Sequence, residues 1–118
     1  MKTASRSELL AAIMLYASFL EKSYSQTGFS SLWHAEVSPK NKYFQILTVS
    51  NGSRSSHSWI DMDGLIWKSA SYKSPEKNFP RGSVFHPDKK GEWRGITWAG
   101  VTGGRWDAER NKYADDKS

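Results

Sequence analysis

The chain has 118 residues, no cysteine and a formal net charge of +5. This length suits a single domain with one core, and the absence of cysteine excludes disulfides and thiolate metal sites and favours an intracellular location. Six Trp, five Tyr and five Phe argue against an intrinsically disordered chain, although the average composition is polar.

A helix is predicted over residues 6–25. Ser5 and Glu8 have the spacing of a capping box, in which each side chain accepts a hydrogen bond from the other residue's backbone N–H. Apolar residues then recur at helical intervals: Leu9, Ile13, Tyr16 and Leu20. The apolar stripe is widened by a second set: Leu10, Met14 and Ala17. A stripe this wide is expected to pack on a sheet or in a homodimer, and Gly28 is expected to cap the helix.

The basic start of the chain and the apolar run from Leu9 to Leu20 loosely resemble a signal peptide. Glu8, however, opens the run, and Glu21 and Lys22 close it. The run is also too short to span a bilayer. We therefore expect an unprocessed protein in the cytoplasm.

Residues 32–106 are predicted to form mainly antiparallel sheet and loops, because segments rich in β-branched and aromatic residues alternate with turn residues. The predicted strands are 32–37, 43–49, 56–60, 65–71 and a short strand at 82–85. Asn51 and Gly52 give the strongest hairpin signal, although the six polar residues 50–55 favour a longer loop. The segment 94–106 holds a candidate edge strand among glycines.

Residues 107–118 form a charged tail, which is predicted as a short helix or a disordered segment. Neither a repeat nor a domain linker interrupts the sequence. The fold class is therefore α+β, with an N-terminal helix packed on a small antiparallel meander of roughly three to five strands, in one domain over residues 1–118.

The sequence predicts no metal and no cofactor. His34, His57 and His86 lie on separate predicted elements without the spacing of metal ligands. Asp61 and Asp63 loosely echo a calcium-binding loop, but the downstream ligands of such a loop are missing. Both are therefore interpreted as turn residues.

A hydrolase that uses His57 is the weakest functional alternative. His57 and Asp61 are four residues apart on one predicted strand and would share a face, as a general-base pair requires. Nothing in the sequence supplies a nucleophile or an oxyanion donor beside them. We therefore expect no enzymatic activity.

The excess positive charge is concentrated between residues 68 and 90, which hold six cations and two carboxylates. A localised cationic patch suggests a phosphate-bearing ligand or an acidic protein surface. Pro75 and Pro80 exclude an uninterrupted helix in this segment. The charge should therefore be presented from a strand end and an irregular loop, where binding groups are often found.

Several residue types in this segment suit a phosphate-bearing ligand. Lysines act as point charges for phosphate, arginine can bind it bidentately, and serine hydroxyls add donors. An aromatic ring offers a face on which a base can stack. The predicted ligand-binding residues are Lys68, Ser71, Tyr72, Lys73, Lys77 and Arg81. Trp67 is interpreted as a core residue.

The same region contains the motif G-x-I-x-K-x-A-S-aromatic-K-x-P-x-K, followed by R-G-x-V-F. The motif is filled by Gly64, Ile66, Lys68, Ala70, Ser71, Tyr72, Lys73, Pro75, Lys77, Arg81, Gly82, Val84 and Phe85. It resembles a block in small accessory proteins of tailed bacteriophages, with departures at Tyr72, Glu76 and Pro80. The resemblance implies a phage origin and a location in the cytoplasm of an infected bacterial host, and it implies no mechanism.

Together these features predict a small non-enzymatic binding protein whose basic loop holds a phosphate-bearing ligand. That ligand would be single-stranded nucleic acid or a nucleotide, such as a host defence signal. The alternative is a protein inhibitor whose loop docks on an acidic surface of a host or anti-phage defence enzyme. The aromatic residues among the cations favour the first interpretation, because a base can stack on them.

Overall fold

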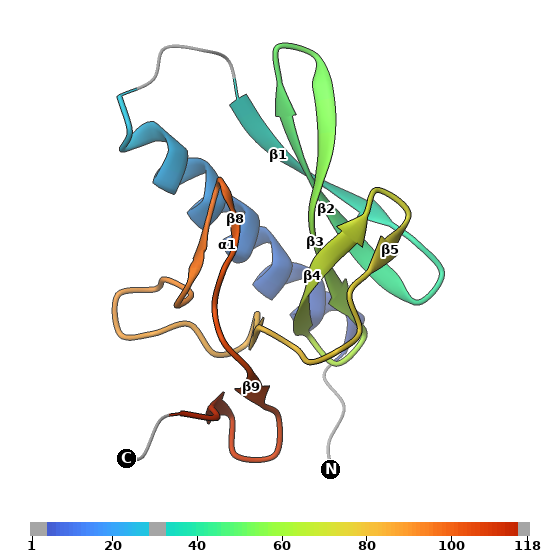
Figure 1. The fold of residues 1–118 in the computed structure, drawn as a ribbon, viewed down its shortest axis with the longest axis vertical. Coiled ribbons are helices and arrows are strands. Elements are labelled where there is room, and N and C mark those ends of the chain that lie inside the picture. The colour runs from blue at the N-terminus through green and yellow to red at the C-terminus, as the bar shows by residue number, and fades with distance from the viewer. Residues whose placement is uncertain (1–4, 29–32, 116–118) are drawn as a thin grey trace.

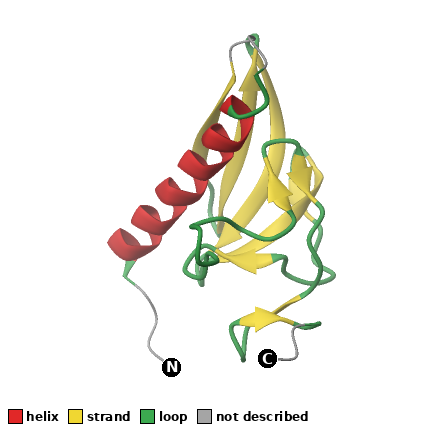
Figure 2. Cartoon of the chain, turned by 90° about the vertical axis from the view of Figure 1, so that its left-hand side faces the viewer, coloured by secondary structure: helices red, strands yellow, loops and turns green. Residues whose placement is uncertain are grey.

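The computed structural model describes residues 5–28 and 33–115. One helix, α1 (Arg6–Ser25), packs against one face of an antiparallel sheet (Figure 1, Figure 2). The long strands are β1 (Trp33–Pro39), β2 (Tyr43–Ser50), β3 (Ser53–Asp61) and β4 (Leu65–Ser71). The short strands are β5 (Ser74–Pro75), β6 (Gly82–Ser83), β7 (Ile96–Thr97), β8 (Gly100–Val101), β9 (Trp106–Asp107) and β10 (Lys112–Tyr113).

The sheet is a meander in the order β1-β2-β3-β4-β5, and β6 also pairs with β4. Two small ladders, β7 with β8 and β9 with β10, lie outside it. The predicted strands at 32–37, 43–49 and 65–71 correspond to β1, β2 and β4, although residue 32 lies outside the described residues. The α+β class is confirmed.

The helix spans the predicted residues 6–25. The Ser5 hydroxyl accepts a hydrogen bond from Glu8 N at 3.1 Å, and a Glu8 carboxylate oxygen accepts one from Ser5 N at 3.1 Å, which completes the predicted capping box. The C-cap is Gln26, so the capping role predicted for Gly28, with its φ of 80°, is wrong. Among the described residues, no helix is long and apolar enough to cross a membrane.

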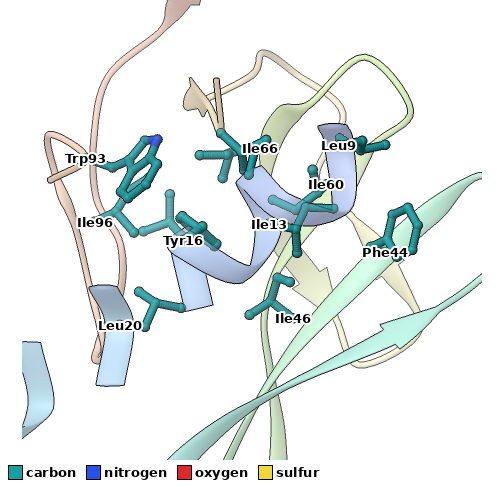
Figure 3. Close-up of a cluster of buried hydrophobic side chains, with 13 residues drawn as sticks. Leu9, Ile13, Tyr16, Leu20, Phe44, Ile46, Ile60, Ile66, Trp93 and Ile96 are labelled. Carbon is teal, nitrogen blue, oxygen red and sulfur yellow. The ribbon is translucent and has the colours of Figure 1, made fainter. Parts of the chain in front are cut away.

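The core lies between α1 and the inner face of the sheet (Figure 3). The helix buries Leu9, Ala12, Ile13, Tyr16, Ala17, Leu20 and Tyr24. Most of them join one cluster with side chains of the central strands: Phe44, Ile46, Ile60 and Ile66. The predicted packing of the helix on a sheet is confirmed, although Met14 of the second apolar set is 57 % exposed. A homodimer through this helix stays a prediction.

A two-residue turn joins β2 and β3, and the longer loop that was the alternative is wrong. Asn51 and Gly52 have φ angles of 52° and 83°, the left-handed conformation that a type I′ hairpin turn requires at both positions. Ser50 pairs directly with Ser53, so β3 begins before the predicted start of that strand. Polar residues can continue an antiparallel strand where one face of the sheet meets water.

A β-bulge in β3 places two consecutive side chains on the inner face. The register shifts between Ile46 and Leu47 of β2, and His57 is left without a partner across the ladder. Ser58 Oγ lies 2.9 Å from the Tyr16 hydroxyl of the helix, and the centroids of the His57 and Tyr16 rings are 6.4 Å apart. Both bulge residues therefore face α1.

The predicted tail, residues 107–118, folds back as the β9–β10 hairpin in its described part. The prediction of a short helix or a disordered segment is wrong there, while residues 116–118 lie outside the described residues. The Trp106 and Tyr113 rings pack edge to face at 5.0 Å, and the Tyr113 hydroxyl lies 3.1 Å from the Arg81 carbonyl oxygen. Aromatic packing therefore orders a segment whose charges suggested a solvated tail.

Candidate functional site

A groove of about 570 Å³ opens on the outer face of the sheet, the face that points away from α1. Phe44 and Ile46 belong to the core, so the residues that alternate with them along β2 face outward. Gln45 and Trp59 pair across β2 and β3 and form part of the floor. The lining residues are Lys40, Asn41, Lys42, Tyr43, Gln45, Trp59, Tyr72, Lys73, Ser74, Pro75 and Lys77.

Two segments form the walls of this groove. The turn between β1 and β2 (40–42) forms one wall, and the β4–β5 hairpin with the residues around it (72–77) forms the other (Figure 1). Gln45 Nε2 on β2 donates to the Tyr72 carbonyl at 2.7 Å. Since β3 lies between β2 and β4 in the sheet, this contact requires the β4–β5 hairpin to bend over the outer face. Gln45 Nε2 also donates to Ser56 Oγ at 2.9 Å, so its amide fixes the hairpin above the floor.

The groove is strongly basic. The lysines that line it are Lys40, Lys42, Lys73 and Lys77. No Asp or Glu is among the lining residues, and no ion pair to these lysines occurs within residues 5–28 and 33–115. Glu76 does not line the groove, and its carboxylate accepts a hydrogen bond from Asn78 Nδ2 at 2.9 Å. A concave surface with one sign of charge concentrates ions of the opposite sign.

Aromatic rings lie among these lysines. Tyr72 is 52 % exposed, so its side chain is accessible to a ligand. Tyr43 is half-buried and packs edge to face against Trp59, with ring centroids 5.9 Å apart. Lys77 Nζ lies 5.8 Å from the centroid of the Tyr43 ring, within reach of a cation–π contact. The groove thus places ammonium groups next to two tyrosine rings.

Ser71 supports the hairpin turn and does not line the groove. Its hydroxyl lies 3.1 Å from Ser74 Oγ and accepts a hydrogen bond from Lys73 N at 3.2 Å. Ser71 thus helps to position Lys73, and its role as a donor to the ligand stays a prediction. Of the predicted binding residues, the structure brings Tyr72, Lys73 and Lys77 together.

Arg81 is a structural residue, which corrects its assignment to the binding set. Arg81 is only 7 % exposed, and its Nη1 donates to the Gly103 carbonyl at 3.2 Å. The guanidinium carbon lies 4.2 Å from the centroid of the Phe79 ring, and Glu76 lies 3.9 Å from Nη2. A planar guanidinium can stack and donate at the same time, and here it links the loop after β5 to the segment around Gly103.

Lys68 lies on the other face of the sheet from the groove. It pairs with Ser58, whose side chain faces the helix, and it alternates with Trp67, which pairs with Trp59 on the outer face. Its exposed ammonium therefore cannot join the groove lysines. Trp67, which was assigned to the core, is half-buried, and its Nε1 donates to Asp61 Oδ2 at 3.0 Å.

The His57–Asp61 pair of the hydrolase alternative is not assembled. His57 Nε2 lies 2.7 Å from the Thr97 carbonyl oxygen, and Nδ1 lies 2.8 Å from Ser58 Oγ. The Asp61 carboxylate instead accepts hydrogen bonds from Trp67 Nε1 and from the turn backbone. Burial lowers the pKa of His57, which fits a neutral imidazole that bridges the bulge to β7.

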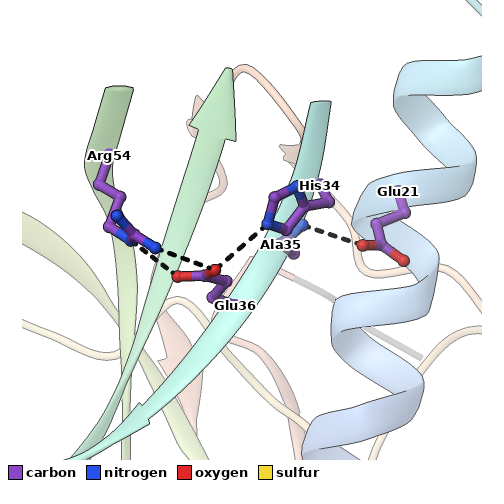
Figure 4. A network of polar contacts seen from close by, with 5 residues as sticks. All are labelled: Glu21, His34, Ala35, Glu36 and Arg54. Carbon is purple, nitrogen blue, oxygen red and sulfur yellow. Dashed lines mark hydrogen bonds and ion pairs between the residues drawn. The ribbon is translucent and has the colours of Figure 1, made fainter. Parts of the chain in front are cut away.

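A second polar cluster lies at the β1 edge of the sheet (Figure 4). Glu36 accepts a hydrogen bond from Arg54 Nε at 2.9 Å and lies 3.2 Å from His34 Nε2. These hydrogen bonds, chiefly the one from Arg54, lower the pKa of Glu36. Glu21 of α1 accepts a hydrogen bond from Ala35 N at 3.0 Å and so covers part of the open edge. Exposed ion pairs of this kind contribute little to stability. We interpret the cluster as a set of contacts that hold the edge strand β1 against β3 and α1.

Lys40 and Lys42 line the groove although the charge pattern of the sequence does not indicate them. Residues 31–67 have no net charge, so the charge distribution along the sequence does not indicate a basic site at this turn. One signal for these lysines was available in the sequence. Side chains alternate along β2 from Tyr43 onward, so the outward-facing Tyr43 ring lies next to the turn 40–42 that carries both lysines. Only the curl of the distant hairpin reveals that these lysines face Lys73 and Lys77 across one groove.

The helix, the meander and this groove define a small α+β protein with a basic, tyrosine-lined groove on the open face of its sheet. Residues 4–103 match the family described as "Family of unknown function (DUF7717)", and the chain belongs to that family. A search of curated proteins and a search of solved structures gave no match.

Within the part of the chain that the structure describes, no group of three or more His, Asp or Glu side chains is placed to hold a metal ion. The lysines of the groove offer electrostatic attraction, and its tyrosine rings offer faces for stacking.

Proposed function

We propose that this protein is a non-enzymatic binding protein whose basic groove holds a phosphate-bearing ligand, either single-stranded nucleic acid or a nucleotide such as a host defence signal. One observation carries the proposal: among the described residues, four lysines and no carboxylate line a groove that also presents the exposed side chain of Tyr72. From the resemblance to phage accessory proteins we further propose that the protein acts in the cytoplasm of an infected bacterium.

The lysines and the tyrosines have different parts in this proposal. Lys73 and Lys77 neutralise phosphate charge, and each contact releases counterions when the ligand is a nucleic-acid strand. Tyr72 stacks on a base, which contributes about 1–3 kcal/mol in proteins of this kind. Both contributions require an exposed side chain, and Tyr72, Lys73 and Lys77 are all exposed.

An acidic surface of a host or defence protein is the alternative partner, because lysines would attract it as well. The open ring of Tyr72 favours a nucleotide base over such a surface, since the ring offers stacking that carboxylates cannot use. Purification of the protein without nuclease separates the two alternatives, because bound nucleotide or nucleic acid is expected only for the first.

The test is purification of the full chain from a bacterium without nuclease, followed by the ratio of absorbance at 260 to 280 nm and mass spectrometry of any bound nucleotide. We expect bound nucleotide or nucleic acid with the wild type and its loss in a Lys73→Ala, Lys77→Ala double variant. The matched control is Lys89→Ala with Lys90→Ala, which removes the same charge outside the groove. Equal retention by both variants would contradict the proposal.

A further inference from the structure

The two walls of the groove carry their charges separately. Lys40 and Lys42 belong to the β1–β2 turn, whereas Lys73 and Lys77 belong to the region of the β4–β5 hairpin. A ligand that contacts both walls must carry negative charge at more than one place. A nucleic-acid strand does so, because each nucleotide adds one phosphodiester.

The type of cation is informative as well. Among residues 5–28 and 33–115, no arginine lines the groove, and Arg81 donates to the Gly103 carbonyl instead. Terminal phosphates are commonly held by arginine forks, by glycine-rich loops or by a helix N-terminus, but the lining residues include no glycine, and Ser5 and Glu8 cap α1. Lysines on flexible stems accept phosphates without a fixed geometry, which suits diesters spaced along a chain.

The polar groups of the floor are engaged within the protein. Gln45 Nε2 donates to Ser56 Oγ and to the Tyr72 carbonyl, and Trp59 Nε1 donates to a serine hydroxyl. The floor therefore has few free donors with which to read the edge of a base. The rings of Tyr72 and Tyr43 can stack on any base, so little sequence preference is expected.

We infer that the groove binds a single strand of nucleic acid that crosses from one lysine wall to the other, with bases on the tyrosine rings and phosphates at both walls. This inference rests on the proposed function and narrows it to a strand, because the successive phosphodiesters of a strand can meet lysines of both walls. A duplex is a poor ligand, since its bases are already stacked and paired and cannot reach Tyr72.

The experiment is a fluorescence-anisotropy titration of the full chain with fluorescein-labelled oligothymidylate. The competitors are thymidine monophosphate, oligothymidylates of about three, six and twelve nucleotides, and a duplex that contains the longest strand. We expect the six-nucleotide strand to compete at least tenfold better than the monophosphate and at least tenfold better than the duplex, whereas a cytosine strand of equal length should compete about equally.

Variants of the wall at the β1–β2 turn give a second readout, the salt dependence of strand binding. Lys40→Ala with Lys42→Ala should weaken strand binding as strongly as Lys73→Ala with Lys77→Ala, and each pair should flatten the salt dependence by about 1.4, because each phosphate contact contributes about 0.7. Lys89→Ala with Lys90→Ala should leave the slope unchanged. All six lysines are exposed, so circular dichroism should confirm that every variant is folded.

Three results would overturn the inference. Competition by the monophosphate as strong as by the six-nucleotide strand, at one site per chain, would leave the proposed function intact but reject a strand. Equal competition by the duplex would reject stacking on Tyr72. Failure of every nucleotide and oligonucleotide to bind would reject the proposed function together with the inference.

Discussion

Neighbouring cations of one basic segment have opposite roles on the two sides of Asn78. Lys73 and Lys77 are exposed and line the groove, whereas Arg81 is buried and donates to the Gly103 carbonyl. The difference follows from chemistry, since a planar guanidinium can be stacked and desolvated while a lysine ammonium is strongly hydrated. Formal charge within a sequence window therefore does not show which cations reach a ligand.

The largest loss of stability should come from Gly95→Ala, which disturbs the segment that binds the buried Arg81. Gly95 has a φ of 73°, and an added Cβ would clash with the Gly103 backbone, whose carbonyl accepts from Arg81. We expect the free energy of unfolding to fall by about 3 kcal/mol or more in a urea titration. Gly104→Ala is the matched control, because open space surrounds that Cβ, and it should change stability by less than about 0.5 kcal/mol.

Arg81→Ala should lower the free energy of unfolding by about 2 kcal/mol, because it leaves the Gly103 carbonyl unpaired and removes a stacked, buried side chain. Lys73→Ala should change it by less than about 0.5 kcal/mol, as is usual for an exposed position. Thermal denaturation measures both. Similar stability losses in the two variants would remove the distinction between structural and binding cations.

His57 predicts a pH dependence that arises on the inner face and not in the groove. Burial lowers its pKa in the folded protein below the ordinary value of 6.5. The unfolded chain therefore binds the proton more readily, and the stabilisation is complete above about pH 6.5 and is lost as the pH falls toward the folded pKa. The slope from this group is at most about 1.4 kcal/mol per pH unit.

Urea titrations between pH 8 and pH 5 measure that slope, and His57→Gln should reduce it. Ligand binding at the groove should not share this dependence, because His57 bonds to Thr97 and Ser58 on the inner side of the sheet. An unchanged slope in His57→Gln would assign the pH dependence to other groups.

Tyr72→Ala should have the smallest effect on stability, below about 0.5 kcal/mol, because Tyr72 is 52 % exposed. It should still weaken strand binding about tenfold with little change in the salt dependence, since stacking releases no cations. Tyr72→Phe keeps the ring and should bind like the wild type. Weak binding by Tyr72→Phe would indicate a role for the hydroxyl instead of stacking.

The sequence was sufficient wherever one local signal determined the structure. The capping box at Ser5 and Glu8 and the helical spacing after it predicted α1, and β-branched and aromatic runs between turns predicted β2 and β4. Asn51 and Gly52 likewise specify the hairpin, because their turn chemistry outweighs the effect of the polar residues on either side.

Three features that the sequence did not predict depend on contacts between residues distant in the sequence. Arg81 is predicted to bind a ligand, and its structural role does not follow from the sequence, because its partner, the Gly103 carbonyl, belongs to a segment with no clear pattern of its own. The groove needs the hairpin at Tyr72 to curl onto Gln45, two strands away, and no local pattern specifies that curl. The C-terminal hairpin likewise depends on Tyr113 reaching the Arg81 carbonyl.

The most direct test of the account is the salt dependence of strand binding in paired variants. Labelled oligothymidylate of about twelve nucleotides is titrated with the wild type, with Lys73→Ala, Lys77→Ala and with Lys89→Ala, Lys90→Ala at several salt concentrations. The account predicts that the first pair weakens binding and flattens the slope by about 1.4, while the second pair, of equal charge, leaves the slope unchanged. Equal slopes in the two variants would show that net charge alone governs binding and would contradict a groove at Lys73 and Lys77.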